Sequence, residues 1–134
     1  MVLEHSHLKE NKTIEISGSK SISNRLLILH QLFDNILIQN LSNSQDTQLL
    51  QAALQSDSDI IDIYHAGTAM RFLTSYYAIQ EGKTVVLTGS ERMKQRPIKF
   101  LVDALRDLGA EISYLENEGF PPLKISGKKI LKGT

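Results

Sequence analysis

Cysteine is absent from this sequence, and neither sign of charge is in excess. Without thiols the chain has no disulfide framework, no thiolate zinc site and no cysteine nucleophile. Its 15 Lys and Arg residues balance its 15 Asp and Glu residues, so the formal net charge is +0. A nucleic acid or a membrane surface that recognises bulk charge is therefore disfavoured as a partner. An anionic ligand would have to be bound by a few well-placed cations.

Long hydrophobic runs are also missing. The N-terminal stretch MVLEHSHLKENK is polar and lacks the apolar core of a signal peptide, and no run approaches membrane-spanning length. We therefore expect a soluble cytoplasmic protein. His5, His7 and His30 are not grouped as metal ligands, so no metal site is expected. The chain does have 41% hydrophobic residues among its 134, which is enough for the core of one domain.

Strands and helices alternate in the hydrophobic pattern. Residues 1–12 are polar and poorly determined, and they are assigned no element. Short apolar or alternating runs predict strands, and apolar residues at helical spacing predict helices. The predicted strands are 13–16, 36–38, 60–64, 84–88, 111–115 and 123–126, and the predicted helices are 21–33, 44–54, 67–80 and 97–108. This order is typical of α/β layers, with a hairpin at the end.

Two of the predicted helices carry additional signals. Helix 67–80 is apolar nearly all round, so we expect it to be buried on most sides. Helix 97–108 has one apolar face, with Pro97 suited to its first turn and Gly109 placed just past its C-terminus.

Cations stand at three of the four predicted helix starts, although the helix dipole favours anions there. Lys20 and Arg25 belong to the first start, Arg71 to the third and Arg96 to the fourth. Only the second start carries the expected acid, Asp46. In an open α/β fold the helix starts gather at the C-terminal edge of the sheet, where small residues let an anion reach backbone N–H groups. The sequence therefore predicts a binding site for a small, multiply anionic molecule.

Each of these features also has a simpler structural explanation. The run Gly18–Ser21 is similar to part of a phosphate loop, but the first glycine of that motif is missing. Arg92 and Lys94 are expected to be solvated surface charges. His65 directly precedes the third helix start, and it is either a contact to the ligand or a residue that fills the loop. The coincidence of three cationic starts is what favours a shared ligand.

Three ordered motifs resemble the 5-enolpyruvylshikimate-3-phosphate synthase family: Gly18–Arg25 (GSKSISNR), Ala66–Arg71 (AGTAMR) and Arg96–Ile98 (RPI). The resemblance extends over residues 14–127. It implies an enzyme that transfers the enolpyruvyl group of phosphoenolpyruvate to the 5-hydroxyl of shikimate 3-phosphate and releases phosphate, with no metal or organic cofactor. It also implies an α/β fold of two lobes built from βαβαββ units, of which residues 13–134 would be an incomplete N-terminal lobe.

The same resemblance implies which residues bind the shikimate substrate. Lys20 matches the family lysine that contacts both substrates near the reacting centre, so it is the expected catalytic residue. Ser21 and Arg25 match the pair on the shikimate moiety, with Arg25 on its carboxylate. All three residues belong to the first cationic helix start.

The phosphoenolpyruvate side is implied in the same way. Gly67 and Arg96 match positions that bind phosphoenolpyruvate, and Arg71 matches a neighbouring arginine with a supporting role. The chain departs from the family pattern at His65, where asparagine is usual, and at Phe72, where proline is usual. Both departures lie beside the expected phosphoenolpyruvate pocket.

Two rival functions stay open. A related enolpyruvyl transferase acts on a UDP-sugar, but its opening motif and its reactive cysteine are missing here. The other rival is a non-catalytic module that binds small anions. The family's acid–base residues and second lobe have no counterpart here, and residues 131–134 end without a capping element, so we expect a truncated chain that is inactive alone. We expect the full-length parent to be a monomer and the chain alone to self-associate.

Overall fold

The computed structural model describes residue 11 and residues 13–129. The predicted segment 1–12, apart from residue 11, and the chain end at 131–134 lie outside the described residues. The helices are α1 (Lys20–Leu32), α2 (Gln45–Leu54), α3 (Gly67–Ala78), α4 (Glu91–Lys94) and α5 (Lys99–Asp107). The strands are β1 (Ile60–Asp62), β2 (Thr84–Thr88), β3 (Glu111–Tyr114) and β4 (Leu123–Ser126). All four predicted helices are present, and the structure adds the short helix α4.

The four strands form one mixed sheet in the order β1-β2-β4-β3. Strands β1 and β2 are parallel, as a crossover through α3 requires, and β4 is antiparallel to both β2 and β3. Apart from α4, residues 60–126 therefore run β1-α3-β2-α5-β3-β4, which is one βαβαββ unit. The expected α/β class and the expected terminal hairpin are confirmed.

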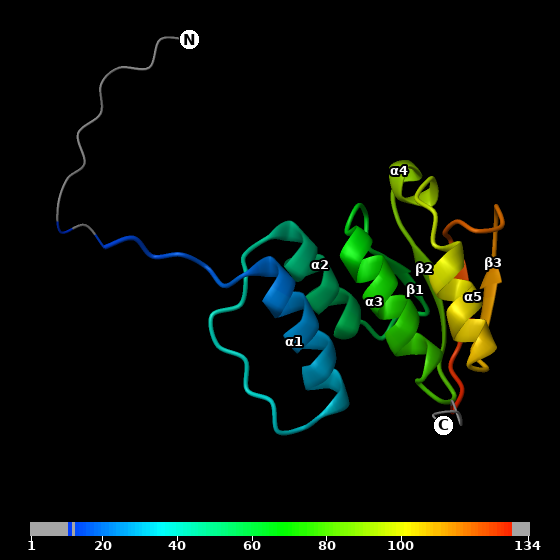
Figure 1. Ribbon diagram of the computed structural model, residues 1–134, viewed down its shortest axis with the longest axis horizontal. Coiled ribbons are helices and arrows are strands. Elements are labelled where there is room, and N and C mark those ends of the chain that lie inside the picture. The colour runs from blue at the N-terminus through cyan, green and yellow to red at the C-terminus, as the bar shows by residue number, and fades with distance from the viewer. Residues whose placement is uncertain (1–10, 12, 130–134) are drawn as a thin grey trace, which may run out of the picture.

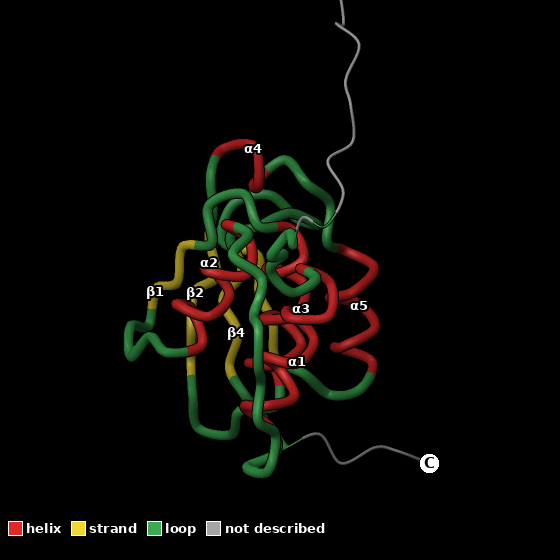
Figure 2. Tube along the Cα trace, turned by 90° about the vertical axis from the view of Figure 1, so that its left-hand side faces the viewer, coloured by secondary structure: helices red, strands yellow, loops and turns green. Residues whose placement is uncertain are grey.

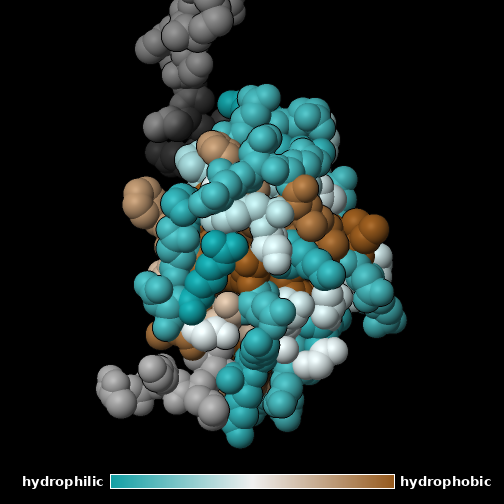
Figure 3. Space-filling model, turned by 90° about the vertical axis from the view of Figure 1, so that its right-hand side faces the viewer, coloured by the Kyte–Doolittle hydropathy of each residue, from teal (hydrophilic) through white to brown (hydrophobic). Residues whose placement is uncertain are grey.

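The helices cover one face of the sheet, and no helix of residues 13–129 lies on the other face (Figures 1 and 2). The strand side chains alternate accordingly, since Val85, Leu87 and Ile125 face the helices and are almost fully buried. Thr84 and Lys124 point the other way and are exposed. This alternation is typical of a sheet with one solvated face. The face over α5 and the β3 edge is also largely hydrophilic, with hydrophobic side chains confined to smaller patches (Figure 3).

Helix α3 lies at the centre of the helix layer and supplies much of the core. Met70, Leu73 and Tyr77 are at most 2% exposed, because α3 packs against α1, α2, α5 and the sheet. The Tyr77 hydroxyl donates a hydrogen bond to the Ala53 carbonyl at the end of α2, 3.1 Å away. The expectation that this nearly all-apolar helix is buried on most sides is confirmed. Among the described residues, no helix is both long and apolar enough to span a bilayer.

Two predicted strands, 13–16 and 36–38, are absent from the structure. Both segments lack regular secondary structure, and Ile14, Ile16 and Leu37 are 81%, 79% and 83% exposed. The alternating pattern is local, but a strand also needs a neighbour to accept and donate its backbone hydrogen bonds. No described strand lies beside either segment. These two predictions were wrong for that reason.

The segment between β2 and α5 also differs from expectation. Helix α5 begins at Lys99 with Ile98 as its N-cap residue, so Pro97 lies before the helix and not in its first turn. The residues ahead of Pro97 form α4, whose N-cap Ser90 accepts a hydrogen bond from the Met93 N–H. Gly109 has φ +100, a left-handed conformation that glycine adopts without strain, and it ends α5 as expected.

Candidate anion-binding site

The N-terminal ends of α1, α3 and α5 lie at one end of the molecule, the upper end in Figure 1, together with α4. Strand β2 runs toward this end, so the helix starts gather at the C-terminal edge of the parallel strands. Such an edge is where α/β folds present free backbone N–H groups to ligands. The arrangement that the three cationic helix starts predicted is therefore present.

Gly67, Arg71 and Arg96 are in direct contact. Arg71 donates hydrogen bonds to the Gly67 carbonyl (3.2 Å) and to the Pro97 carbonyl (3.1 Å), which ties the start of α3 to the residue that follows Arg96. The Arg96 guanidinium lies against the α-carbon of Gly67, where a methyl group would be 2.8 Å from its central carbon. A side chain at position 67 would displace the guanidinium from this place. The structure thus brings together all three residues expected on the phosphoenolpyruvate side.

Lys20, Ser21 and Arg25 form a second group along the first turns of α1. The Lys20 ammonium is 3.3 Å from the Asp46 carboxylate at the start of α2. Arg25 donates to the Ser21 carbonyl (2.8 Å) and also contacts the Ser21 hydroxyl. The Lys20 side chain is 52% exposed, so its ion pair contributes little free energy and an anion can displace it.

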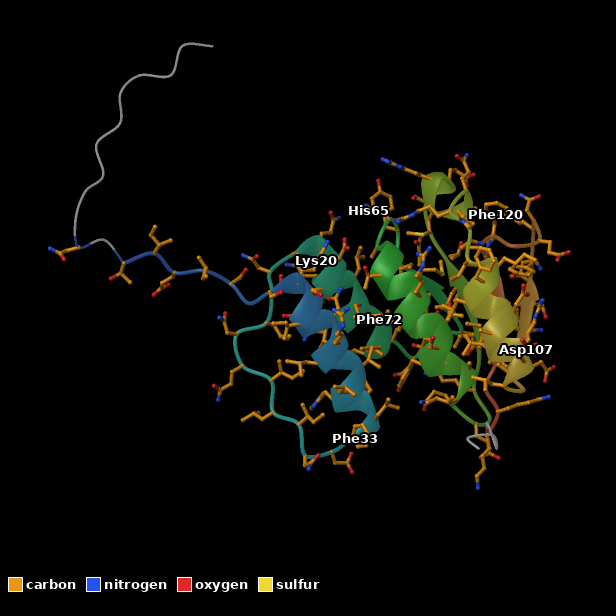
Figure 4. The ribbon with its side chains drawn as sticks, viewed as in Figure 1. Lys20, Phe33, His65, Phe72, Asp107 and Phe120 are labelled. Carbon is orange, nitrogen blue, oxygen red and sulfur yellow. The ribbon has the colours of Figure 1, made fainter. Side chains whose placement is uncertain are left out.

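Phe72 connects the two groups of residues. The Arg25 guanidinium lies over the Phe72 ring, 5.9 Å from its centroid, and Phe72 follows Arg71 on α3. In Figure 4, Lys20 and His65 stand at the same end of the helix layer, and Phe72 lies further along α3. The two sets of expected site residues are therefore neighbours, although no hydrogen bond in the described part of the chain joins them.

Several cations of the chain are neutralised by carboxylates, but among residues 13–129 the arginines at the helix starts and in α4 are not. Lys94, Lys99, Arg106 and Lys128 each form an ion pair with Asp or Glu. Among residues 13–129, none of the four arginines at the helix starts and in α4 has such a partner; they are Arg25, Arg71, Arg92 and Arg96. Unpaired guanidinium groups that gather at one edge raise the local positive potential. The positive charge of these four arginines can therefore interact with an anion at this end of the molecule.

Lys94 does not behave as the solvated charge that was predicted. Its ammonium lies 2.9 Å from Glu116 and 3.4 Å from Glu91, and its side chain is only 23% exposed. The hydrogen bond that Lys94 donates to Glu116 raises the pKa of Lys94, and Glu91 adds to that effect. Lys94 thus serves to hold α4 on the β3–β4 connection.

A pocket of about 410 Å³ lies beside Gly67, lined by His65, Arg92, Met93 and Arg96. The His65 ring stacks edge-on against Tyr64, with ring centroids 4.7 Å apart. Arg92 is exposed, as predicted, but it also lines this pocket, which the sequence reasoning did not foresee. The sequence holds no local signal for this placement, because α4 ends at Lys94 and Arg96 lies beyond it.

The donor atoms of this site suit an anion rather than a metal ion. Within the part of the chain that the structure describes, no three His, Asp or Glu side chains gather as metal ligands do. Arginine guanidinium groups carry only donors, which match phosphate and carboxylate oxygens. What the arrangement can do chemically is bind and orient anions and stabilise negative charge that develops on them.

Comparison with known proteins gives a consistent result. The family model described as EPSP synthase (3-phosphoshikimate 1-carboxyvinyltransferase) matches residues 50–134. A 3-phosphoshikimate 1-carboxyvinyltransferase from Bacteroides fragilis (strain YCH46) is 54% identical over 120 residues, covering 88% of this chain and 29% of that protein. The same-named protein from Shewanella pealeana is 41% identical over 153 residues, covering 94% of this chain and 36% of that protein.

A solved structure has the same fold. The EPSP synthase from Acinetobacter baumannii superimposes with a TM-score of 0.75 at 22% sequence identity, over 90% of this chain and 33% of that one. At this identity the likeness concerns the fold alone. The chain thus spans about a third of the length of the relatives and of the solved structure that it matches.

Proposed function

This chain belongs to the EPSP synthase family, and we propose that it forms the anion-binding part of an enolpyruvyl transferase. In the proposed reaction, the enolpyruvyl group of phosphoenolpyruvate moves to the 5-hydroxyl of shikimate 3-phosphate and phosphate is released. Lys20, Ser21 and Arg25 bind shikimate 3-phosphate, and Lys20 also contacts phosphoenolpyruvate at the reacting centre. Gly67 and Arg96 bind phosphoenolpyruvate, and Arg71 supports them. A cytoplasmic enzyme without metal or organic cofactor is part of this proposal.

The proposed reaction requires positive charges near both substrates, and this end of the molecule carries them. Protonation of the enol carbon creates a cationic centre, which the 5-hydroxyl attacks, and phosphate then leaves from the tetrahedral adduct. Both substrates are anions that repel each other, so fixed cations are needed to hold them within reach. Cations placed at the departing phosphate also stabilise the charge that develops there. In the proposal this chain supplies binding and charge stabilisation, and residues outside it supply proton transfer.

One observation carries the proposal. The Arg96 guanidinium lies directly on Gly67 at the start of α3, and Arg71 bridges the same helix start to Pro97. A phosphate or carboxylate at this point could accept hydrogen bonds from the guanidinium and from the first N–H groups of α3. Asp46, the acid closest to Lys20, is already matched by that lysine, so it adds no uncompensated negative charge.

Binding measured on the isolated chain tests the proposal. We expect shikimate 3-phosphate and phosphoenolpyruvate each to shift ¹H–¹⁵N NMR signals of the helix starts. Arg25→Gln should weaken shikimate 3-phosphate about tenfold, and Arg96→Gln should weaken phosphoenolpyruvate by a similar factor, since each loses a charge-assisted hydrogen bond. Lys124→Gln is the matched control, because it removes one positive charge from the solvated face of the sheet.

Two results would contradict the proposal. The first is that neither substrate perturbs the helix starts at millimolar concentration. The second is that Lys124→Gln weakens both substrates as much as the site variants do, because binding would then depend on net charge alone. Phosphate release by the isolated chain in the presence of both substrates would overturn the narrower statement that it binds without turnover.

The assembly state of the chain alone stays a prediction. A pocket of about 410 Å³ between α1 and α3 is lined mainly by apolar side chains, among them Ile28, Leu29, Phe72 and Tyr76. Apolar surface of this kind favours association, so we propose that the chain self-associates while its full-length parent is a monomer. Sedimentation velocity over a hundredfold concentration range tests this, and a constant monomeric coefficient would contradict it.

A further inference from the structure

The pocket beside Gly67 has an unusual lining. Of its four lining residues, Arg92 and Arg96 are cations, and His65 carries ring nitrogens that form hydrogen bonds. The fourth, Met93, is 1% exposed and closes the pocket from the core side. No carboxylate contributes to the lining. The volume of about 410 Å³ is larger than a single phosphate group needs, so the pocket can admit a small phosphorylated molecule.

The α4 segment divides its charges between two sides. Lys94 is turned toward Glu116 and Glu91, and these ion pairs neutralise it. Arg92 and Arg96, four residues apart, line the pocket and have no carboxylate partner in the described part of the chain. Two like charges that line one pocket repel each other, and a bound anion would offset that repulsion.

The two loops that form the pocket are fixed to each other. The Ser90 N–H donates to the Tyr64 carbonyl at 2.9 Å, one residue before His65. At Gly89 the backbones come so close that a methyl group there would lie 2.6 Å from the Tyr64 carbonyl oxygen. Arg71 holds Pro97, and therefore the end of the α4 segment, to Gly67. The pocket is thus built before any ligand binds, which reduces the entropy lost on binding.

We infer that Arg92 is a phosphate-binding residue and that it acts together with Arg96 and His65 on one phosphate group. A carboxylate carries one charge and two oxygens, which a single guanidinium can bind in a bidentate manner. A phosphate group carries close to two charges and three acceptor oxygens, so it can engage both guanidinium groups at once. The inference rests on the proposed function insofar as the phosphate belongs to phosphoenolpyruvate. It assigns to Arg92 a specificity for phosphate over carboxylate.

The test uses inorganic phosphate and pyruvate as separate probes of the intact chain. We expect inorganic phosphate to shift the backbone NMR signals of His65 and Met93, and Arg92→Gln to weaken its binding about tenfold. Pyruvate offers a carboxylate without a phosphate, and we expect Arg92→Gln to change its affinity less than twofold. Arg92→Lys should restore part of the phosphate affinity because it restores the charge without the fork. Lys124→Gln is again the control, and thermal melts confirm that each variant folds.

The outcomes separate this inference from the proposed function. If Arg92→Gln binds inorganic phosphate as tightly as the unmodified chain, or if phosphate does not shift the pocket signals, the role of Arg92 is refuted. Shikimate 3-phosphate binding that depends on Arg25 would survive that result. Conversely, phosphate binding that depends on Arg92, without any binding of shikimate 3-phosphate or phosphoenolpyruvate, would support this pocket and refute the proposed function.

Discussion

Residues 13–54 and residues 60–126 use similar sequence patterns with different results. In residues 60–126 each predicted strand has a neighbour, and the unit closes into a four-stranded sheet with α3 and α5 on one face. In residues 13–54 both helices form, but neither predicted strand does. Helices satisfy their hydrogen bonds internally, whereas strands depend on residues far away in the sequence. The difference shows that a strand pattern predicts a strand only where a partner strand is also present.

The two regions also differ in how completely their apolar surface is covered. The sheet of residues 60–126 turns Thr84 and Lys124 to its open face, and the α5 side of the molecule is largely hydrophilic (Figure 3). Its apolar exceptions are Ile60 on β1 and Phe100 on α5, which are 64% and 93% exposed. Helix α1 buries Leu27 against α2 and α3, but Leu29 on α1 and its C-cap residue Phe33 are 40% and 54% exposed. The stable centre of the chain should therefore lie in the βαβαββ unit. The following predictions test that division.

The largest effect is expected from the sheet core. Leu87 on β2 is fully buried, so Leu87→Ala removes apolar contacts and leaves a cavity. We expect the free energy of unfolding to fall by about 3 kcal/mol. Leu29→Ala on α1 should cost about 1 kcal/mol or less, because Leu29 is already 40% exposed and lines the apolar pocket between α1 and α3. Urea denaturation followed by circular dichroism measures both values.

Equal losses in the two variants would contradict this division of stability. They would mean that α1 and the sheet contribute alike to one cooperative core. A second unfolding transition confined to Leu29→Ala would instead show that α1 separates from the unit before the sheet unfolds. The comparison is matched, because both variants remove the same three side-chain carbons.

A smaller effect is expected at the contact between the two regions. Burial raises the pKa of Tyr77 to about 12, and the nearby Tyr76 adds to the shift. In the unfolded chain this phenol loses its proton near pH 10, so between pH 10 and 12 the folded chain binds more protons than the unfolded chain. The free energy of unfolding should therefore fall by about 2 kcal/mol as pH rises through this window, and the contribution is complete below pH 10.

Tyr77→Phe separates this effect from the other tyrosines. Burial also raises the pKa values of Tyr76 and Tyr114. The free energy of unfolding of the unmodified chain therefore falls at high pH by the sum of three tyrosine contributions, all of which lower it. The phenylalanine variant loses the hydrogen bond to Ala53, which should cost about 1 kcal/mol near neutral pH. Above pH 10 the gap between the two chains should close and then reverse, because the contribution lost by the unmodified chain (about 2 kcal/mol) exceeds the gap at neutral pH (about 1 kcal/mol). A gap that stays constant up to pH 12 would show that Tyr77 does not titrate as stated.

Much of the site could be predicted because its signals are local. The three helix starts with Lys20, Arg71 and Arg96 are visible in the sequence, and helix order places them at one edge of the sheet. The contact between Arg96 and Gly67 follows from that placement together with the small residue. The same local reasoning located four helices and, to within two residues, four of the six predicted strands.

The parts that could not be predicted depend on distant partners. Lys94 was expected in solvent, but the β3–β4 connection brings Glu116 to it across 22 residues of sequence. Arg92 is exposed as predicted, but its place in the pocket depends on the close approach of Gly89 to the Tyr64 carbonyl. Neither contact has a sequence pattern of its own. Both are consequences of how the βαβαββ unit closes.

The smallest effect is expected where a predicted strand failed to form. Ile14 and Ile16 are 81% and 79% exposed, so replacing both with threonine should change the free energy of unfolding by less than about 0.5 kcal/mol. Val85→Thr is the matched change on a real strand, where residue 85 is 1% exposed and the new hydroxyl would be buried. We expect it to cost about 2 kcal/mol in the same urea titration. A loss of 1 kcal/mol or more in the double variant would show that residues 13–16 pack against a partner in solution, for example a second copy of the chain. Their alternating pattern would then be that of a strand whose neighbour lies outside residues 13–129.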